Sequence, residues 1–146
     1  MAAAADHKIR LIGTWTLVSA VREEVPSGAV DYMFGETPRG YINYSPEGRM
    51  IALITRSDRA APTNGKPTAA EAEALYRGML SYAGAYSIAD DVVTHHVDIS
   101  WNESFNGGEQ KRHFRFEGDR LILSTPQSYD PIDRKMSVRR MTWEKV

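Results

Sequence analysis

The stretch EQKRHFRFEGDRLILST, residues 109–125, decides the fold. From 109 to 117 two sets of side chains alternate, as they do along a strand with one buried face. One set is almost entirely charged and has to face water: Glu109, Lys111, His113, Arg115 and Glu117. The other set is expected to point inward: Gln110, Arg112, Phe114 and Phe116. A second strand, 120–125, follows after the turn EGD, so this stretch predicts an antiparallel hairpin.

Similar short strands occur on both sides of this hairpin. The patterns predict strands over 11–22, 40–45, 49–55, 85–89, 92–101 and 137–145. Connections this short favour antiparallel neighbours, because a parallel return needs a longer crossover. We therefore expect a mainly β protein, an antiparallel up-and-down barrel of about eight strands with one α-helix. Residues 1–146 are expected to form a single domain, with 1–9 as a frayed terminus.

The expected helix is TAAEAEALYRGMLSYAG, residues 68–84. Thr68 and Glu71 form a capping-box pattern at its start, and Gly84 is a typical C-terminal stop. An apolar stripe recurs at helical spacing: Ala72, Leu75, Tyr76, Met79, Leu80 and Ala83. This stripe is expected to pack on the sheet or over the mouth of the barrel.

The hairpin formed by 40–45 and 49–55 turns at SPEG, read as a four-residue turn that pairs Tyr44 with Arg49. This register puts Tyr41 and Asn43 on one face with Met50, Ala52 and Ile54. That face is the better core face, because the opposite one would include the charged Arg49. Tyr41 and Asn43 are therefore candidates for hydrogen bonds to a ligand inside the barrel.

Two histidines stand side by side in VTHHVDISW, residues 93–101, and only one of them can face inward. If residue 101 pairs with 109, Asp98 lies opposite Arg112, and the interior holds Thr94, His96, Asp98 and Ser100. A slip of one residue puts His95, Val97, Ile99 and Trp101 inside instead. Hydrophobic burial favours the second register. We favour the first, because an inward arginine without a partner is costly, and the second stays open.

The composition excludes several classes of function. The chain has no cysteine, which rules out disulfides and thiolate zinc sites, and His95 and His96 diverge too far to share a metal. Net charge is −1 with dispersed basic residues, so no nucleic-acid partner is expected. No apolar run of membrane length and no signal peptide occurs, which indicates a cytoplasmic protein. No nucleotide-binding motif is present, so no cofactor is expected, while a homodimer stays open.

Several segments together resemble a known family. GTW at 13–15 looks like the G-x-W signature of lipocalins. LIGTWTLVSA, PRGYINYSPEGRM, VVTHHVDIS and EQKRHFRFEGDRLILST resemble, in order, the bacterial lipocalin-like single-domain proteins. The resemblance implies a small β-barrel with a helix and an apolar interior able to hold a small molecule. Related barrels include both carriers and cofactor-free cyclases or isomerases, so the resemblance does not decide between binding and catalysis.

Two functions from different classes follow. In the first, the barrel binds a small, largely apolar molecule whose polar or anionic group faces Arg112. The candidate binding residues are Tyr41, Asn43, His96, Asp98, Ser100, Gln110, Arg112 and Phe114. In the alternative, the protein is a cofactor-independent isomerase, cyclase or lyase. His96, oriented by Asp98, would then move a proton and Arg112 would stabilise an oxyanion. Whether the protein is an enzyme stays open, as does a barrel filled by its own side chains.

Overall fold

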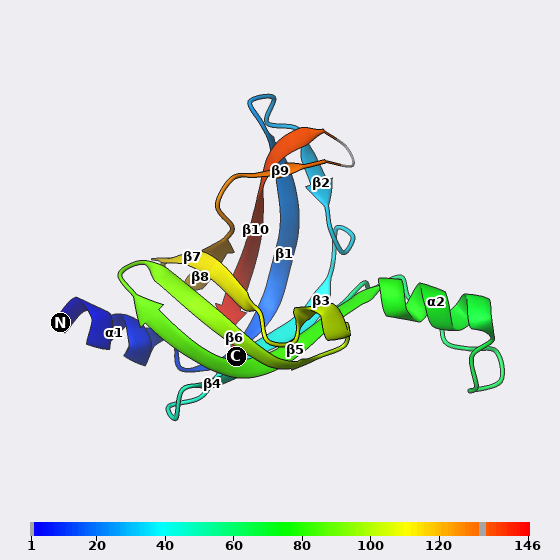
Figure 1. Ribbon diagram of the computed structural model, residues 1–146, viewed down its shortest axis with the longest axis horizontal. Coiled ribbons are helices and arrows are strands. Elements are labelled where there is room, and N and C mark those ends of the chain that lie inside the picture. Colours follow the sequence, from blue (N-terminus) through cyan, green and yellow to red (C-terminus); the bar gives the residue numbers. More distant parts are fainter. Residues whose placement is uncertain (1, 132–133) are drawn as a thin grey trace.

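Eight antiparallel strands close into a barrel in the computed structural model, which describes residues 2–131 and 134–146 (Figure 1). The barrel strands are β1 (Gly13–Val25), β3 (Arg39–Tyr44), β4 (Arg49–Thr55), β5 (Met79–Ala89), β6 (Val92–Ser100), β7 (Glu109–Glu117), β8 (Arg120–Ser124) and β10 (Lys135–Lys145). Each pairs with the next in this order, and β10 returns to pair with β1. The predicted mainly β barrel is thus confirmed.

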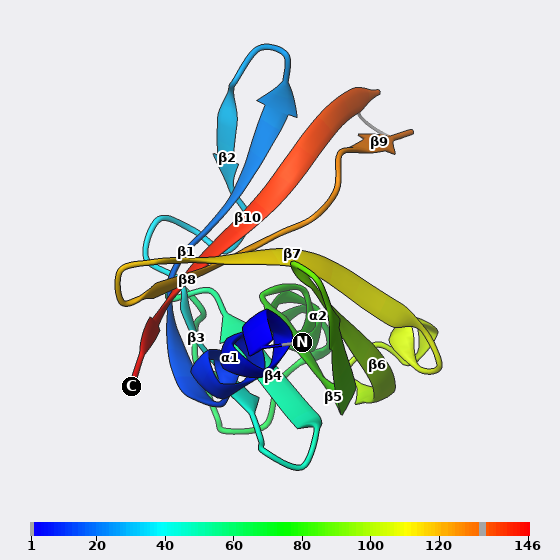
Figure 2. The same cartoon turned by 90° about the vertical axis from the view of Figure 1, so that its left-hand side faces the viewer.

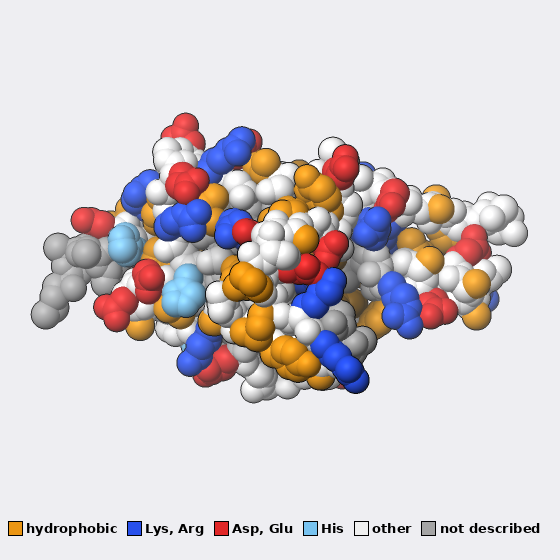
Figure 3. Space-filling model, turned by 90° about the horizontal axis from the view of Figure 1, so that it is seen from above, with side chains coloured by type: hydrophobic (Ala, Val, Ile, Leu, Met, Phe, Trp, Pro, Cys, Tyr) orange, Lys and Arg blue, Asp and Glu red, His pale blue; other side chains and the backbone are white. Residues whose placement is uncertain are grey.

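The hairpin of β1 and β10 extends beyond the barrel. Two short strands pair with this extension, β2 (Val30–Tyr32) on β1 and β9 (Ser128–Asp130) on β10. Figure 1 shows the four strands rising together above the barrel. Over this end of the molecule, Lys and Arg side chains are interspersed with Asp and Glu (Figure 3).

A helix at the N-terminus closes one end of the barrel. The predicted frayed terminus over 1–9 is wrong for residues 2–9, which lie in α1 (Ala2–Leu11), and residue 1 lies outside the described residues. Figure 2 shows α1 in front of the ring of strands. Leu11 is fully buried and its carbonyl oxygen accepts a 2.9 Å hydrogen bond from Trp15 Nε1. The His7 ring packs edge-on against Phe114. These contacts seal this end with aromatic side chains.

The central helix is shorter than predicted. The capping box of Thr68 and Glu71 is present, but α2 (Ala69–Arg77) ends at Gly78, and none of its residues is buried. From Met79 the chain continues as β5, whose buried residues alternate: Tyr82, Gly84 and Tyr86. The prediction of a helical stripe over these residues is wrong because Met79, Leu80 and Ala83 fit a strand as well as a helix. Pairing with β4 stabilises the strand. The helix projects away from the barrel (Figure 1).

The hairpin of β3 and β4 has a register one residue away from the expected one. Ser45 pairs with Arg49 around a three-residue turn, in which Gly48 adopts a φ of +89°. Tyr44 therefore lies opposite Met50, and the buried face holds Ile42 and Tyr44. Tyr41 is 57% exposed on the outer surface, and Asn43 donates to Thr14 Oγ1 there. Neither reaches the interior, so their expected place inside the barrel is wrong.

Among the described residues, no helix is both long and apolar enough to cross a membrane.

Candidate functional site

Pairing between β6 and β7 ends at Val97, which is earlier along β6 than either expected register allows. His95 lies opposite Gln110, His96 opposite Glu109 and Val93 opposite Arg112. The last hydrogen bonds of the hairpin join Val97 to Gly107 and Gly108. Residues 99 and 100 pair with β5 instead, and the chain returns to β7 through the short 3-10 helix η1 (Glu103–Phe105). As far as Val97, the side chains of β6 that face the interior are therefore those of the second expected register.

The predicted pairing of His96 and Asp98 inside the barrel is therefore wrong. Both side chains lie on the outer surface, with exposed fractions of 42% and 53%. Asp98 accepts a 2.6 Å bond from Arg49, and His96 lies 3.4 Å from Glu109. Neither residue can face a ligand in the interior or pair with Arg112. Their proposed catalytic roles lose their geometric basis.

A β-bulge at Asp98 changes the phase of β6. The register with β5 shifts between Ala83 and Gly84, so Gly84 lies opposite Val97 while Ala83 lies opposite Ile99. A side-chain carbon at Gly84 would stand 1.8 Å from the carbonyl oxygen of His96, so only glycine permits this approach. Past the bulge, Ser100 is partly buried and bonds to Asn102 and Asn106 in the following loop. It does not meet Gln110.

His95 is the buried histidine, and it bridges two tyrosines. Tyr44 Oη lies 2.6 Å from Nε2, and Tyr82 Oη lies 2.6 Å from Nδ1. Burial, with smaller effects from Arg112 and His96, lowers the pKa of His95 from 6.5 to about 3. Burial raises the pKa of Tyr82 to about 12, partly opposed by Arg112, and raises the pKa of Tyr44 well above its ordinary value. All three groups are neutral at physiological pH.

An outer cavity of about 440 Å³ opens at the end of the barrel opposite α1. Strand β7 runs from Gln110 and Arg112 at this cavity to Phe116 beside α1. The apolar wall consists of Met33, Phe34, Leu80, Phe105 and Met141. The polar wall consists of Arg22, Asp31, Gln110, Arg112 and Arg139. The combination of apolar surface and a few polar groups is the usual form of a small-molecule pocket.

Arg112 is a partly buried charged residue on the wall of this cavity. Its guanidinium donates to the Lys111 carbonyl oxygen at 2.8 Å and to Gln110 Oε1 at 3.2 Å, both neutral acceptors. Among the described residues, no carboxylate lies within ion-pair distance of it. Asp31, the one carboxylate in the cavity wall, is bound to Arg22 at 3.0 Å. The cavity therefore carries an excess of positive charge.

Below the outer cavity lies a second, much smaller one of about 30 Å³. Leu80, Arg112 and Met141 line both cavities, so the two meet at these side chains. The inner wall also includes Tyr82, His95 and Trp143. Phe114 is buried but lines neither cavity; it packs beside His7 and Phe116 near α1. Of the predicted site residues, the structure brings only Gln110 and Arg112 to the cavity.

Sequence reasoning missed Tyr44, Tyr82 and His95 as members of one group. Tyr82 was placed in the expected helix, and Tyr44 was placed on the outer face by the turn length. The alternation of Leu80, Tyr82, Gly84 and Tyr86 is typical of a strand and could have identified Tyr82 as an interior residue. Among the described residues, no three side chains form a group that could hold a metal.

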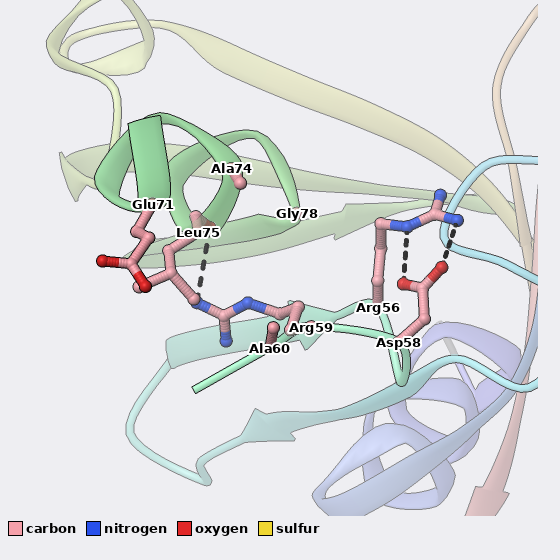
Figure 4. A pocket seen from close by; sticks show the side chains of 8 residues that line it. All are labelled: Arg56, Asp58, Arg59, Ala60, Glu71, Ala74, Leu75 and Gly78. Atoms are coloured by element: carbon pink, nitrogen blue, oxygen red, sulfur yellow. Dashed lines mark hydrogen bonds and ion pairs between the residues drawn. The ribbon is translucent and has the colours of Figure 1, made fainter. Parts of the chain in front are cut away.

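A groove of about 290 Å³ beside α2 is the other hollow of note (Figure 4). Its charged side chains bind one another or the backbone. Arg56 and Asp58 form two bonds of 2.9 and 3.0 Å, and Arg59 donates to the Leu75 carbonyl oxygen at 3.3 Å. Glu71 caps α2 and accepts from Thr63. With these groups satisfied, the groove is a weaker candidate than the barrel.

Comparison with known proteins agrees with this architecture. The family model of the lipocalin-like domain matches residues 12–146, and the chain belongs to this family. A lipocalin-like protein from Bacteroides uniformis is 14% identical with a TM-score of 0.48, over 94% of this chain and 99% of that one. An uncharacterized protein from Bacteroides eggerthii is 13% identical with a TM-score of 0.46, over 93% and 99%. The search of curated proteins found no match.

Proposed function

We propose that this barrel binds a small, largely apolar molecule whose anionic group faces Arg112. Lipocalin-like barrels commonly hold small hydrophobic ligands, and the outer cavity supports such a role here. Its volume of about 440 Å³ lies within the range of roughly 300–1,000 Å³ usual for ligand pockets. The apolar wall would bury the body of the ligand, and that burial would supply most of the affinity.

The observation that carries the proposal is the state of Arg112. Arg112 is a partly buried guanidinium bonded only to neutral acceptors, on the wall of a cavity that also has apolar side chains, so part of its charge is desolvated without a counter-charge. A ligand carboxylate or phenolate would supply the missing charge. Arginine suits this role because its planar fork can donate two parallel hydrogen bonds to one carboxylate.

Calorimetric titration with naphthylacetate, and with naphthylethanol as its uncharged analogue, tests the proposal. We expect the acid to bind more tightly than the alcohol. Substitution Arg112→Met keeps the length of the side chain but removes the charge, and we expect it to weaken acid binding by about 10- to 100-fold. The alcohol should bind the variant about as well as the wild type.

Arg49→Met is the matched control, because Arg49 lies on the outer surface in an exposed ion pair with Asp98. We expect acid binding to be unchanged in this variant. Equal losses in the two variants, or equal affinity of acid and alcohol for the wild type, would contradict the role of Arg112. A panel of apolar acids that all fail to bind would contradict the proposed function itself.

The alternative of a cofactor-free enzyme rested on His96 and Asp98 as acid–base pair. Both lie outside the barrel, so the structure gives that mechanism no support. His95, which does lie inside, has a pKa lowered to about 3 and both ring nitrogens within hydrogen-bond distance of tyrosines. The proposal is accordingly one of binding.

A further inference from the structure

We propose that the inner cavity is an oxyanion subsite: Tyr82, Trp143 and Arg112 line it with hydrogen-bond donors for one oxygen of a bound carboxylate. The inference rests on the proposed function and deepens it, because it places the anionic head below Arg112 rather than at the cavity mouth. Three features support this placement: the hydrogen-bond balance around His95, an unpaired tryptophan nitrogen and the shared wall of the two cavities.

The hydrogen-bond balance of His95 leaves one tyrosine proton unused. In a neutral imidazole, one ring nitrogen donates and the other accepts. Of the two tyrosines, therefore, one donates its proton to His95, and the other accepts a proton from it and keeps its own O–H for another acceptor. Which tyrosine keeps its proton depends on the tautomer of His95.

The surroundings of the two hydroxyls decide between the tautomers. Tyr44 is fully buried, lines neither cavity, and has His95 as the one hydrogen-bond partner of its hydroxyl among the described residues. A free O–H there would be a buried donor without an acceptor, which is expensive. Tyr82 lines the inner cavity and is 6% exposed, so of the two tyrosines it is the one with space beside its side chain. The favoured state therefore has Tyr44 donating to Nε2, Nδ1 donating to Tyr82, and the Tyr82 O–H available to the cavity.

Trp143 adds a second donor without a partner. Its side chain is 1% exposed and lines the inner cavity, and Nε1, itself buried, has no hydrogen-bond partner among the described residues. Trp15, by contrast, donates from Nε1 to the Leu11 carbonyl oxygen at 2.9 Å. Trp101 Nε1 is also buried without a partner among the described residues, but Trp101 lines neither cavity. It is therefore the place of Trp143 in the wall of the inner cavity, together with its unpaired N–H, that points to an acceptor there.

The way the cavities meet fixes how a ligand would enter. The inner space of about 30 Å³ has room for little more than one oxygen, about the volume of a water molecule. Arg112 lines both cavities, so it can hold a carboxylate that places one oxygen inside and its carbon skeleton outside. With Nε2 of His95 occupied by Tyr44, the polar groups left to the inner cavity are all donors. They match an oxyanion and disfavour a ligand group that donates.

The tautomer is tested first, in the ligand-free protein. Long-range nitrogen–proton correlation spectra of ¹⁵N-labelled protein distinguish a protonated Nδ1 from a protonated Nε2. We expect the proton of His95 on Nδ1. A proton on Nε2 would mean that Tyr82 donates to His95, and this result would overturn the subsite.

The subsite is then tested by titrating naphthylacetate while the tryptophan indole N–H signals are recorded. We expect the Trp143 signal to move downfield as the oxygen accepts its proton, and the Trp15 signal to stay in place because its N–H is already bonded. Tyr82→Phe should weaken binding of the acid by about 10-fold and affect naphthylethanol less. Tyr86→Phe is the matched control, since the Tyr86 hydroxyl donates to the Ser45 carbonyl oxygen away from the cavity.

The outcomes separate this inference from the proposed function. Binding that depends on Arg112 but leaves Trp143 and Tyr82 without effect would overturn the subsite alone and indicate that water fills the inner cavity. Equal losses in Tyr82→Phe and Tyr86→Phe would overturn it as well, by showing a general loss of packing. No binding by any acid would overturn the proposed function, and the subsite with it.

Discussion

His95 and His96 are neighbours in the chain, and their surroundings differ in every respect that matters for function. His95 is 1% exposed, with both ring nitrogens within 2.6 Å of a tyrosine hydroxyl. His96 is on the outer surface, between Ser87 and Glu109. The side-chain alternation of a strand makes one of them interior and the other exterior. The register of β6 decides which one, and with it which chemistry the barrel has.

The difference shows that pairing a charge is not enough to set a register. The need for a partner of Arg112 favoured the register that places Asp98 inside the barrel. The structure instead buries Val93, His95 and Val97. Burial of three apolar or neutral side chains outweighs one ion pair, since ion pairs in the interior recover little beyond their desolvation. Arg112 is left at the edge of a cavity, where an anionic ligand can supply the counter-charge that it lacks.

The largest effect is expected where the bulge fixes the two faces of β6. Gly84→Ala would place a carbon 1.8 Å from the His96 carbonyl oxygen, so β5 and β6 would have to separate or shift register. We expect a loss of about 3 kcal/mol or more in the free energy of unfolding, measured by urea denaturation. Gly65→Ala is the control: no atom lies within 4 Å, and its φ of +73° should cost about 1 kcal/mol. Equal effects would contradict the account of the bulge.

The next effect compares the two histidines directly. His95→Ala leaves two buried tyrosine hydroxyls without their partner, and we expect a loss of about 2–4 kcal/mol. His96→Ala removes an exposed side chain and should change stability by no more than about 0.5 kcal/mol. Urea denaturation of both variants measures the difference. A larger loss for His96→Ala would show that the assigned register is wrong.

A smaller effect concerns pH. The pKa of His95 is lowered from 6.5 to about 3, so below pH 6.5 the unfolded chain binds a proton that the folded protein does not. The contribution of neutral His95 to the free energy of unfolding is therefore fully present above pH 6.5, and it decreases as the pH falls toward 3. Linkage gives a loss of about 1.4 kcal/mol between about pH 7.5 and about pH 5.5.

The matched variant for this pH effect is His95→Gln, which should lack this component of the pH dependence, while His96→Gln should retain it. Denaturation curves at the two pH values give both numbers. A wild-type protein and a His95→Gln variant with the same pH dependence would contradict a neutral, buried His95.

The smallest effect is expected for the outer ion pair. Asp98→Asn removes the partner of Arg49, and both side chains are more than half exposed. Such pairs contribute about 0–1 kcal/mol, so we expect a change in that range and none in ligand affinity. If Asp98→Asn abolished acid binding, the outer surface rather than the interior would be the functional face.

Much of the fold could be predicted from the sequence, because alternation along β7 and the short connections leave few topologies. The orientation of Gln110 and Arg112 followed from a charged outer face that had to meet water. Two local features could not be predicted so directly. One is the three-residue turn at Gly48, which moved Tyr44 inside. The other is the early closure of the β6–β7 hairpin with its bulge at Asp98.

The group of Tyr44, Tyr82 and His95 was harder to predict than the fold. Tyr44 depends on the turn at Gly48, His95 depends on the register of β6, and Tyr82 depends on residues 79–86 forming a strand and not a helix. Turn length and bulges shift a strand by one residue, and one residue exchanges its faces. The predicted places of His96 and Asp98 inside the barrel are therefore wrong, whereas Arg112 lies on the cavity wall, on the inward-facing side of β7 that the alternation predicts.

A crystal structure of the protein with bound naphthylacetate tests the central claim most directly. We predict the carboxylate within hydrogen-bond distance of the Arg112 guanidinium and of Tyr82 Oη, with the naphthyl ring in the outer cavity against Leu80, Phe105 and Met141. A ligand bound instead on the outer surface beside His96 and Asp98, or in the groove beside α2, with the barrel unchanged, would contradict it.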